Sequence, residues 1–291
     1  MFEHITNKHI SRVIIIIKSA LVLVLAFKLW QASQSGYQLN IDREFFIFLA
    51  VGFIAEIVDG ALGMAYGVIC SSFLIYFGVP PALTSSAVHT SEVFTTGVSG
   101  LSHLHFKNVD KELFFKLVIT GVVGSIIGAY ALSKLLDGDV IKPFISAYLL
   151  FIGIRILYQQ IRKIEIAARP LKHVPFLGFA GGALDAIGGG GWGPLVTSTI
   201  LSRGGANAKH TIGTVNTAEF FVTFASTGIF LLLVGVASFK IILALIIGGV
   251  VAAPIGAYVV KQVRQSVLLY IVGSVLVIVS ALSLWNYFWW G

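Results

Sequence analysis

The chain has 291 residues, of which 57% are hydrophobic and 11% are charged, and its formal net charge is +7. Soluble domains carry about 25% charged residues, so this composition excludes a soluble globular domain and indicates an all-α polytopic membrane protein. The basic residues are spread over short loops, which argues against nucleic acid as a partner, and a single cysteine allows no intramolecular disulfide. With no Cys/His cluster in the sequence, we expect neither a metal site nor a cofactor.

The first apolar run, 13–30, follows a polar and basic N-terminus that carries Lys8 and Arg12. A signal peptide is the alternative reading, but Lys18 interrupts the run and the total length suits a membrane anchor better. Lys18 lies near the start of the run, so we expect its long side chain to reach the membrane interface. Residues 1–45 are therefore predicted to form a retained N-terminal helix and an outer loop.

Hydropathy divides the chain into nine apolar segments, each of which could enter a bilayer. The segments are roughly 13–30, 46–78, 84–101, 113–136, 141–160, 174–201, 211–234, 240–261 and 267–288. The second and sixth segments each hold an acid and glycines in the middle, where a helix is expected to break. Either segment could cross once with an unwound centre, or could enter the membrane and return as a helical hairpin.

The charges of the loops separate these two readings. If every segment crosses, the basic loop from Arg162 to Lys172 lies outside, against the positive-inside rule. If segments two and six are re-entrant, this loop lies inside together with Lys107 and Lys111, and Lys240 is the one clear exception. We therefore predict about seven transmembrane helices and two re-entrant or broken-helix hairpins, with the N-terminus in the cytoplasm and the C-terminus outside.

The two broken segments repeat one pattern. Gly52, Phe53, Asp59, Gly63 and Gly67 match Gly178, Phe179, Asp185, Gly189 and Gly193, each 126 residues later, and Tyr66 matches Trp192. A duplicated unit predicts a first transport repeat at 46–160, a basic cytoplasmic linker at 161–173 and a second transport repeat at 174–291. Because each repeat holds one hairpin and three crossings, the two repeats are expected to be inverted copies, as in many secondary transporters.

Four acids are expected near the middle of the membrane, namely Asp59, Glu92, Asp185 and Glu219. Counted from the predicted helix starts, Glu92 and Glu219 each lie about 12 Å deep, from opposite faces. In a structural reading the acids accept hydrogen bonds from the broken helices, with each Asp capping a second half-helix. In a functional reading the acids take up and release protons, and the two roles can coexist.

Glycines at the second break indicate contact with a ligand. Gly188 to Gly191, with Gly193 and then Pro194, predict a loop followed by a helix start, where free N–H groups bind anions. Close helix packing is the alternative role of these glycines. The candidate substrate-binding residues are Gly63, Tyr66, Gly67, Ser86, His89, Thr90, Gly188, Gly189, Gly190, Gly191, Trp192, Asn216 and Thr217. Arg155 is expected to extend to the inner interface, with a gating role as the alternative.

The duplicated Gly-Phe-x6-Asp-x3-Gly-x2-aromatic-Gly pattern, with Pro80, Pro81 and the helix that carries His89 and Glu92, resembles the sulfite exporter TauE/SafE family. The resemblance covers about residues 46–288. It implies an inner-membrane protein that moves sulfite, sulfonates such as sulfoacetate, or related small sulfur-containing anions. By resemblance, the residues around the substrate path would be Asp59, Gly63, Gly67, Asp185, Gly189 and Gly193.

The repeats and the midplane acids predict a secondary transporter, and the resemblance implies that it exports small sulfur-containing anions across the bacterial inner (plasma) membrane. The substrate is expected at the midplane between the two hairpins. Proton coupling is expected because protonated acids no longer repel an anion. The alternatives are a passive anion channel of the same architecture and an intramembrane aspartyl enzyme that uses Asp59 and Asp185. We expect no enzyme activity; the expected partners are the anion, protons and membrane lipid, and a homo-oligomer is left open.

Overall fold

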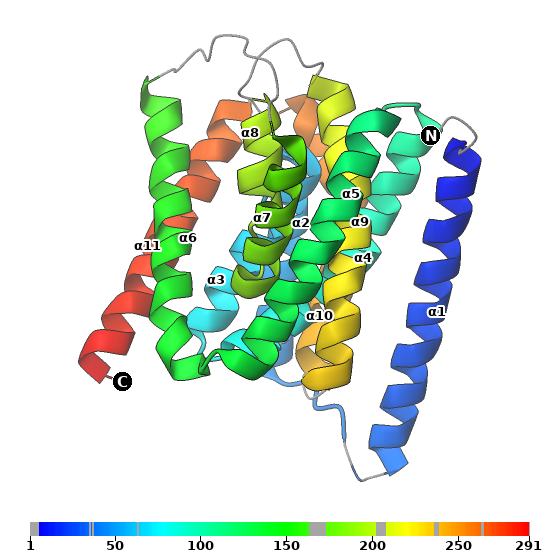
Figure 1. The fold of residues 1–291 in the computed structure, drawn as a ribbon. Helices are drawn as coiled ribbons and strands as arrows, with labels where there is room; N and C mark the ends of the chain where they lie inside the picture. The colour runs from blue at the N-terminus through cyan, green and yellow to red at the C-terminus, as the bar shows by residue number, and fades with distance from the viewer. Residues whose placement is uncertain are drawn as a thin grey trace.

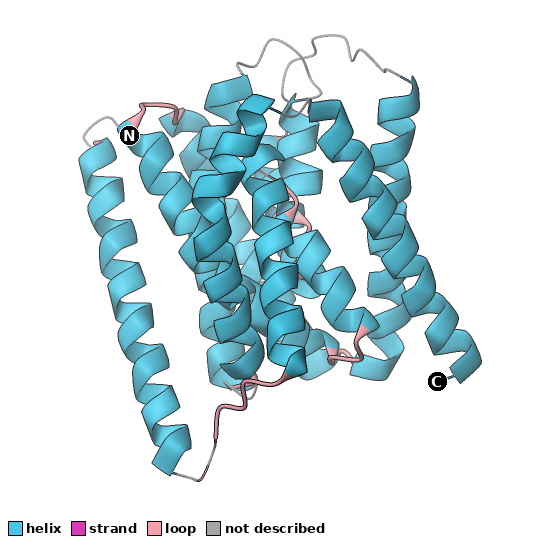
Figure 2. Ribbon diagram, turned by 180° about the vertical axis from the view of Figure 1, so that it is seen from behind, coloured by secondary structure: helices cyan, strands magenta, loops and turns pink. Residues whose placement is uncertain are grey.

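A computed structural model of the chain describes residues 6–34, 36, 38–62, 64–162, 173–201, 208–235, 239–262 and 265–290. Within these ranges every regular element is a helix (Figure 2). The α-helices are α1 (Asn7–Gln34), α2 (Arg43–Leu62), α3 (Tyr66–Tyr76), α4 (Pro81–His105), α5 (Lys111–Tyr130), α6 (Gly138–Arg162), α7 (Val174–Gly188), α8 (Ser198–Leu201), α9 (Ala208–Leu233), α10 (Phe239–Gln262) and α11 (Gln265–Trp290). Two short π-helical segments, η1 (Ala131–Leu135) and η2 (Gly193–Thr197), continue α5 and precede α8.

Five helices in the described part of the chain are long and apolar enough to cross a membrane. They are Asn7–Gln34, Lys111–Leu135, Gly138–Arg162, His210–Leu233 and Leu269–Trp289. The helix is the element that satisfies its own backbone polar groups in lipid, so this composition leads to a helical bundle. The chain is an all-helical polytopic membrane protein, and this part of the prediction is confirmed.

The two apolar segments with central glycines are each folded into two helical arms that run in opposite directions (Figure 1). We call α2 with α3 hairpin 1, and α7 with η2 and α8 hairpin 2. Phe48 near the start of α2 and Phe77 at the end of α3 have ring centroids 6.1 Å apart, so hairpin 1 begins and ends at the same end of the bundle. Hairpin 2 begins and ends at the opposite end, and the start of α1 and the end of α11 also lie at opposite ends of the bundle (Figure 1).

The helices pair in a pattern that occurs twice. α2 packs along α10, and α7 packs along α5, while α4 packs on α9 and α6 packs on α11. Each of these hairpin contacts has a glycine where a side chain would not fit. A Cβ on Gly52 would lie 2.8 Å from the backbone oxygen of Leu245, and a Cβ on Gly178 would lie 3.2 Å from the backbone oxygen of Leu117. Small residues allow helix backbones this close approach in membranes. The same crossing is thus built in both halves of the chain.

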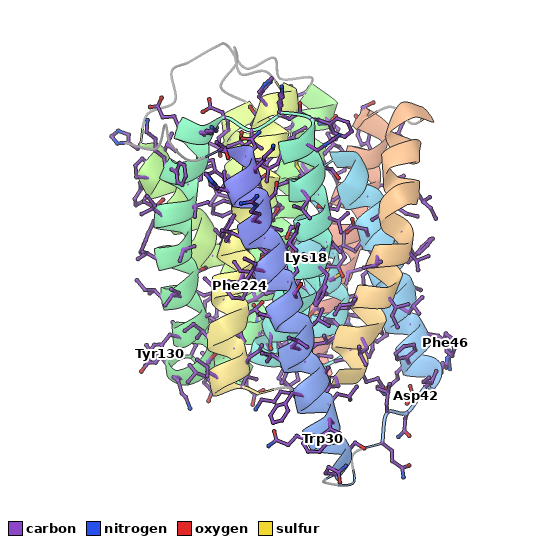
Figure 3. All side chains as sticks on the ribbon, turned by 90° about the vertical axis from the view of Figure 1, so that its right-hand side faces the viewer. Lys18, Trp30, Asp42, Phe46, Tyr130 and Phe224 are labelled. Carbon is purple, nitrogen blue, oxygen red and sulfur yellow. The ribbon has the colours of Figure 1, made fainter. Side chains whose placement is uncertain are left out.

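The first helix packs against α4 at the edge of the bundle (Figure 1). The expectation that Lys18 reaches the interface is wrong, because its Nζ lies 3.4 Å from the carbonyl oxygen of Phe94 on α4. Its alkyl chain lies beside Gly97, where a Cβ would come within 2.6 Å of the Lys18 Cδ. Figure 3 shows Lys18 midway along α1. Because Gly97 has no side chain, there is room for Lys18 to lie between α1 and α4.

The exception to the positive-inside pattern is explained by ion pairs. Lys240 at the start of α10 lies 3.0 Å from Asp42 and 2.6 Å from Glu44, so its charge is offset at this end of the bundle. The three residues come from two segments that are far apart in the sequence, so these ion pairs lie where the start of α2 meets the start of α10. The loop between Arg162 and His173 lies outside the described residues.

Candidate functional site

The four acids predicted to meet near the middle of the membrane line one cavity. Asp59, Glu92, Asp185 and Glu219 line a space of about 10 Å³, which holds about one water molecule. The rest of the wall comes from the breaks of both hairpins and from α4, with Met64, Tyr66, Gly67, Val68, Thr96, Gly190, Gly193 and Pro194. Charged and polar groups from four separate elements therefore converge on one small site.

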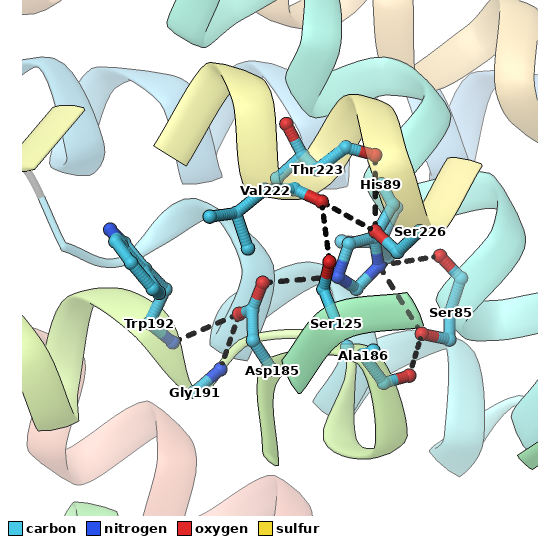
Figure 4. A network of polar contacts seen from close by, with 12 residues as sticks. Ser85, His89, Ser125, Asp185, Ala186, Gly191, Trp192, Val222, Thr223 and Ser226 are labelled. Carbon is cyan, nitrogen blue, oxygen red and sulfur yellow. Dashed lines mark hydrogen bonds and ion pairs between the residues drawn. The ribbon is translucent and has the colours of Figure 1, made fainter. Parts of the chain in front are cut away.

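Asp185 at the end of α7 caps the returning arm of hairpin 2 (Figure 4). Its Oδ1 accepts hydrogen bonds from the N–H of Gly191 at 2.7 Å and of Trp192 at 2.9 Å. The side chain is 1% exposed, so no bulk water could replace it as the acceptor. A carboxylate at the start of a helix accepts from N–H groups that the helix leaves unpaired, and its negative charge interacts favourably with the positive end of the helix dipole.

Asp59 caps hairpin 1 in the same manner. Its Oδ1 accepts from the N–H of Ala65 at 2.6 Å and of Tyr66 at 3.0 Å, which are the positions equivalent to those that bind Asp185. The structural role considered for both Asp residues therefore corresponds to the hydrogen bonds observed. It also means that the donors expected to bind an anion are occupied by carboxylates in this conformation.

His89 links α4 to hairpin 2. Its Nε2 lies 3.1 Å from Oδ2 of Asp185, and its Nδ1 lies 2.8 Å from the backbone oxygen of Ser85. The hydroxyl of Ser85 donates to the carbonyl oxygen of Ala186 at 2.6 Å, which adds a second bond between α4 and hairpin 2 (Figure 4). His89 is fully buried, so this contact is made away from water.

The breaks of the two hairpins touch each other. Gly190 has a φ of +156°, and a Cβ there would overlap the backbone of Gly67 and Val68. A Cβ on Gly193 would in turn come within 2.7 Å of the Cβ of Met64. The hydroxyl of Ser71 on α3 donates to the carbonyl oxygen of Gly189, which ties the two breaks together. No side chain fits where the two hairpins meet, so glycine is required there.

Most of the predicted polar residues of α4 and α9 lie outside the cavity lining. Ser86, Thr90 and Thr217 are buried in these helices. The hydroxyls of Thr90 and Thr217 donate at 2.6 Å to carbonyl oxygens of their own helices. The amide of Asn216 donates to the hydroxyl of Ser99 at 3.2 Å. Of the predicted residues outside these helices, Tyr66 and Gly67 line the cavity, while Gly63 lies outside the described residues.

Arg155 on α6 does not extend to the interface as expected. Its Nη1 donates to the carbonyl oxygen of Pro194 at 3.3 Å and to the hydroxyl of Ser198 at 3.1 Å. The Pro194 carbonyl also accepts a hydrogen bond from the Ser198 hydroxyl, so Arg155 joins a polar contact within the returning arm of hairpin 2. Arg155 therefore holds the returning arm of hairpin 2 against α6.

Two residues that the sequence reasoning missed lie near the site. Glu56 on α2 is 5% exposed, and among the described residues its Oε2 has no hydrogen-bond partner. It was missed because only acids present in both repeats were considered, although an acid within an apolar run is itself a functional signal. Tyr148 on α6 was also missed; its hydroxyl would lie 2.8 Å from a Cβ on Gly191, so it borders the break of hairpin 2.

His89, Glu92 and Asp185 each offer one oxygen or nitrogen atom, and these atoms all lie within 4.8 Å of one another. Two of the three atoms, Nε2 and Oδ2, contact each other directly at hydrogen-bond distance. The two atoms that a metal ion would need are therefore already engaged with each other. The group is a hydrogen-bonded pair, His89 and Asp185, with the Glu92 carboxyl beside it.

Comparison with known proteins agrees with this architecture. Residues 48–284 match the family described as Sulfite exporter TauE/SafE. Over 257 residues the chain is 40% identical to the "Probable membrane transporter protein YtnM" of Bacillus subtilis (strain 168), a match that covers 84% of each chain. No solved structure matches the chain.

Proposed function

The chain belongs to the sulfite exporter TauE/SafE family of membrane transporters, and we propose that it exports small sulfur-containing anions such as sulfite or sulfoacetate by proton-coupled secondary transport. The observation that carries the proposal is the central cavity, which is lined by both hairpin breaks and by four acids. Binding sites of this kind, near the midplane where broken helices meet, recur in secondary transporters.

The proposed architecture has two inverted repeats, 46–160 and 174–291, with seven crossing helices and two re-entrant hairpins. The matching helix pairs α2–α10 and α7–α5 support this relation, as do the equivalent caps at Asp59 and Asp185. The basic inner loops support a cytoplasmic N-terminus in the bacterial plasma membrane. In this topology hairpin 1 enters from outside and hairpin 2 from the cytoplasm.

Transport requires the two hairpins to separate. A cavity of about 10 Å³ is too small for a sulfur oxyanion, so the present conformation is closed around the site. Gly67 and Gly190 lie in contact between the hairpins, and parting them would open space beside the helix starts. Repeat-against-repeat movement about a fixed site then gives alternating access.

The acids determine when an anion can enter. Four ionised carboxylates would repel a sulfonate or sulfite strongly in a medium of low dielectric constant, whereas protonated carboxyls would not. Protonation of Asp59 would also weaken its hold on the backbone donors of hairpin 1, which could then face the anion. Proton and anion binding are therefore expected to be linked. A passive anion channel of the same architecture remains the second candidate, because a central anion path serves either function.

Accumulation of radiolabelled sulfite in proteoliposomes tests the proposal. An imposed pH gradient should drive sulfite above its equilibrium concentration. Gly190→Ala should abolish this because the new side chain would overlap hairpin 1, whereas Gly228→Ala on α9, with no atom within 4 Å of the new Cβ, should not. Equilibration without accumulation would identify a channel, and transport that ignores the pH gradient would remove proton coupling.

Melting of the purified protein in the presence of sulfite, thiosulfate, taurine, sulfoacetate and matched carboxylates tests the substrate class. A ligand that binds only the folded state raises its stability by RT ln(1 + [L]/Kd). A shift with one sulfur anion and none with the matched carboxylate is expected. Equal shifts for both would show that the site selects charge alone.

A further inference from the structure

We propose that the buried His89–Asp185 pair is the binding site of the coupling proton, that Glu92 exchanges this proton with the cavity, and that the proton holds hairpin 2 against α4. The inference rests on the proposed function and names the residues that would carry out its coupling step. It follows from a count of hydrogen-bond donors in the contact between α4 and hairpin 2.

The Nδ1 atom of His89 must carry a hydrogen. Nδ1 lies 2.8 Å from the backbone oxygen of Ser85, and a carbonyl oxygen can only accept. The Ser85 hydroxyl, 3.2 Å from Nδ1, cannot supply the hydrogen instead because it donates to the carbonyl oxygen of Ala186. In a neutral ring, Nε2 is then left as an acceptor.

Nε2 faces another acceptor. It lies 3.1 Å from Oδ2 of Asp185, and an ionised carboxylate has no hydrogen to donate. Oδ1 of the same carboxylate is occupied by the N–H groups of Gly191 and Trp192, so Oδ2 is the oxygen available for the contact. The two side chains are 0% and 1% exposed. The contact therefore needs one added proton, whether it resides on the ring or on the carboxyl.

This proton site occurs in one repeat and not in the other. Both repeats have a capping Asp, but the position in α9 that matches His89 in α4 is Asn216. An amide does not titrate, and that of Asn216 donates to the Ser99 hydroxyl. The caps are thus common to both hairpins, while the proton-dependent contact is a property of hairpin 2.

Groups from several other elements face the pair or the hairpin break beside it. Tyr148 of α6 borders the hairpin break, Asp59 and Glu219 face it across the cavity, and the ring of Phe230 on α9 packs 5.9 Å from that of His89. Glu92 is the acid on the same helix as His89, and its carboxylate comes within 4.8 Å of both members of the pair.

Glu92 is suited to receive the proton. It is 3% exposed, and its Oε2 has no hydrogen-bond partner among the described residues. Unlike His89, it lines the cavity. Transfer breaks the N–H or O–H bond of the pair and forms an O–H bond on the Glu92 carboxylate, so charge moves with the proton and nothing is oxidised or reduced.

Loss of the proton changes the contact between α4 and hairpin 2. Without it, Nε2 and Oδ2 are two acceptors at close distance, and their repulsion replaces a hydrogen bond. Hairpin 2 is then released from α4, while Asp185 still caps the returning arm. Occupancy by one proton is thus linked to the position of the hairpin that borders the site.

Two variants separate the proton from the fold. His89→Asn reproduces the residue of the other repeat, and Asp185→Asn keeps an oxygen for the cap and offers an amide hydrogen to Nε2 without a titrating group. His105→Asn is the matched control, because His105 is exposed on the same helix. In proteoliposomes, His89→Asn and Asp185→Asn should lose sulfite-linked proton movement and sulfite accumulation. His105→Asn should retain both activities, and coupled accumulation by His89→Asn equal to that of this control would overturn the proposal.

A second measurement needs no substrate, so that failure of the transport assay alone would count against the proposed function and not against the proton site. In the ¹⁵N NMR spectrum of histidine-labelled protein, His89 is identified as the signal missing from His89→Asn. Its Nε2 should show a shared or bound proton under conditions in which the protein couples transport to protons. A free-acceptor Nε2 signal under those conditions would show that no proton lies between the two residues.

Discussion

Gly67 of hairpin 1 lies against Gly190 of hairpin 2, and a Cβ on Gly67 would come within 2.7 Å of the Gly190 Cα. The same Cβ would lie 2.8 Å from Oε1 of Glu92, so the site acid closes the third side of this contact. The two broken helices therefore meet backbone to backbone, and the contact closes the cavity that both of them line.

Gly67→Ala should force the hairpins apart. Adding one methyl group to a packed site costs about 1–3 kcal/mol, and separation of the hairpins is the direct way to relieve it. Cys70, one turn further along α3, is fully buried and reports on the opening. We expect the rate of maleimide labelling of Cys70 to rise severalfold.

Gly228→Ala is the control for this experiment, since its added Cβ meets no atom within 4 Å. Its labelling rate should equal that of the wild type. If Cys70 in Gly67→Ala is labelled no faster than in this control and sulfite accumulation is unchanged, the contact between the hairpins does not close the site.

Asp59→Ala should destabilise hairpin 1 by removing the acceptor for two backbone N–H groups. Loss of a cap costs about 1 kcal/mol, whereas Asn keeps an acceptor oxygen and caps nearly as well as Asp. The melting temperature of the detergent-purified protein should therefore fall for Asp59→Ala and stay close to wild type for Asp59→Asn. An equal fall for both would show that the negative charge, and not the hydrogen bonds, stabilises the hairpin.

The repeat in the sequence was sufficient to find the acids that line the cavity. Asp59 and Asp185 recur at a fixed spacing beside glycines, and the helix rise gives the depth of Glu92 and Glu219. The positions of these acids along the chain follow from sequence spacing and from where a helix must stop. Neither depends on which rotamer a side chain adopts.

Side-chain directions could not be obtained in this way. Lys18 and Arg155 were expected to extend to the interfaces, yet each bonds a carbonyl oxygen of a neighbouring helix. Lys18 has room beside Gly97 of α4, and Arg155 meets the Pro194 carbonyl and the Ser198 hydroxyl of hairpin 2, so in each case the partner belongs to a different element from the cation. Glu56 was missed for a different reason, since its equivalent in the second repeat is Gly182 and a search for repeated acids passes over it.

Arg155→Met should loosen the returning arm of hairpin 2. The substitution removes the donor to the Pro194 carbonyl and the Ser198 hydroxyl but keeps an unbranched apolar chain of similar reach. Hydrogen–deuterium exchange in Gly193–Thr197 should become faster, with little change in the α4 peptide that carries His89. Arg162→Met on the same helix is the control, because Arg162 is exposed and stacks on Tyr158. Equal exchange in the two variants would contradict a clamping role for Arg155.

Asp42 at the start of hairpin 1 should make the stability of the protein depend on pH. The N–H of Phe45 donates to its Oδ1 at 3.0 Å, and Lys240 lies 3.0 Å from its Oδ2. The hydrogen bond from Phe45, followed by the hydrogen bond from Lys240, lowers the pKa of Asp42 below its ordinary value. Because the pKa is lowered in the folded state, the carboxylate stabilises the protein above the unfolded pKa of about 3.9, and this contribution is lost as the pH falls through the folded pKa.

Melting temperatures of the wild type and Asp42→Asn between about pH 7 and 3 test this assignment. The wild type should melt higher at neutral pH, and the difference should shrink as the carboxylate is protonated. The difference should be small because the group is exposed and solvent screens its charge. Lys240→Met separates the two causes, since it removes the cation and leaves the Phe45 hydrogen bond. If Lys240→Met loses as much of the pH dependence as Asp42→Asn does, the ion pair and not the backbone hydrogen bond holds the pKa of Asp42 down.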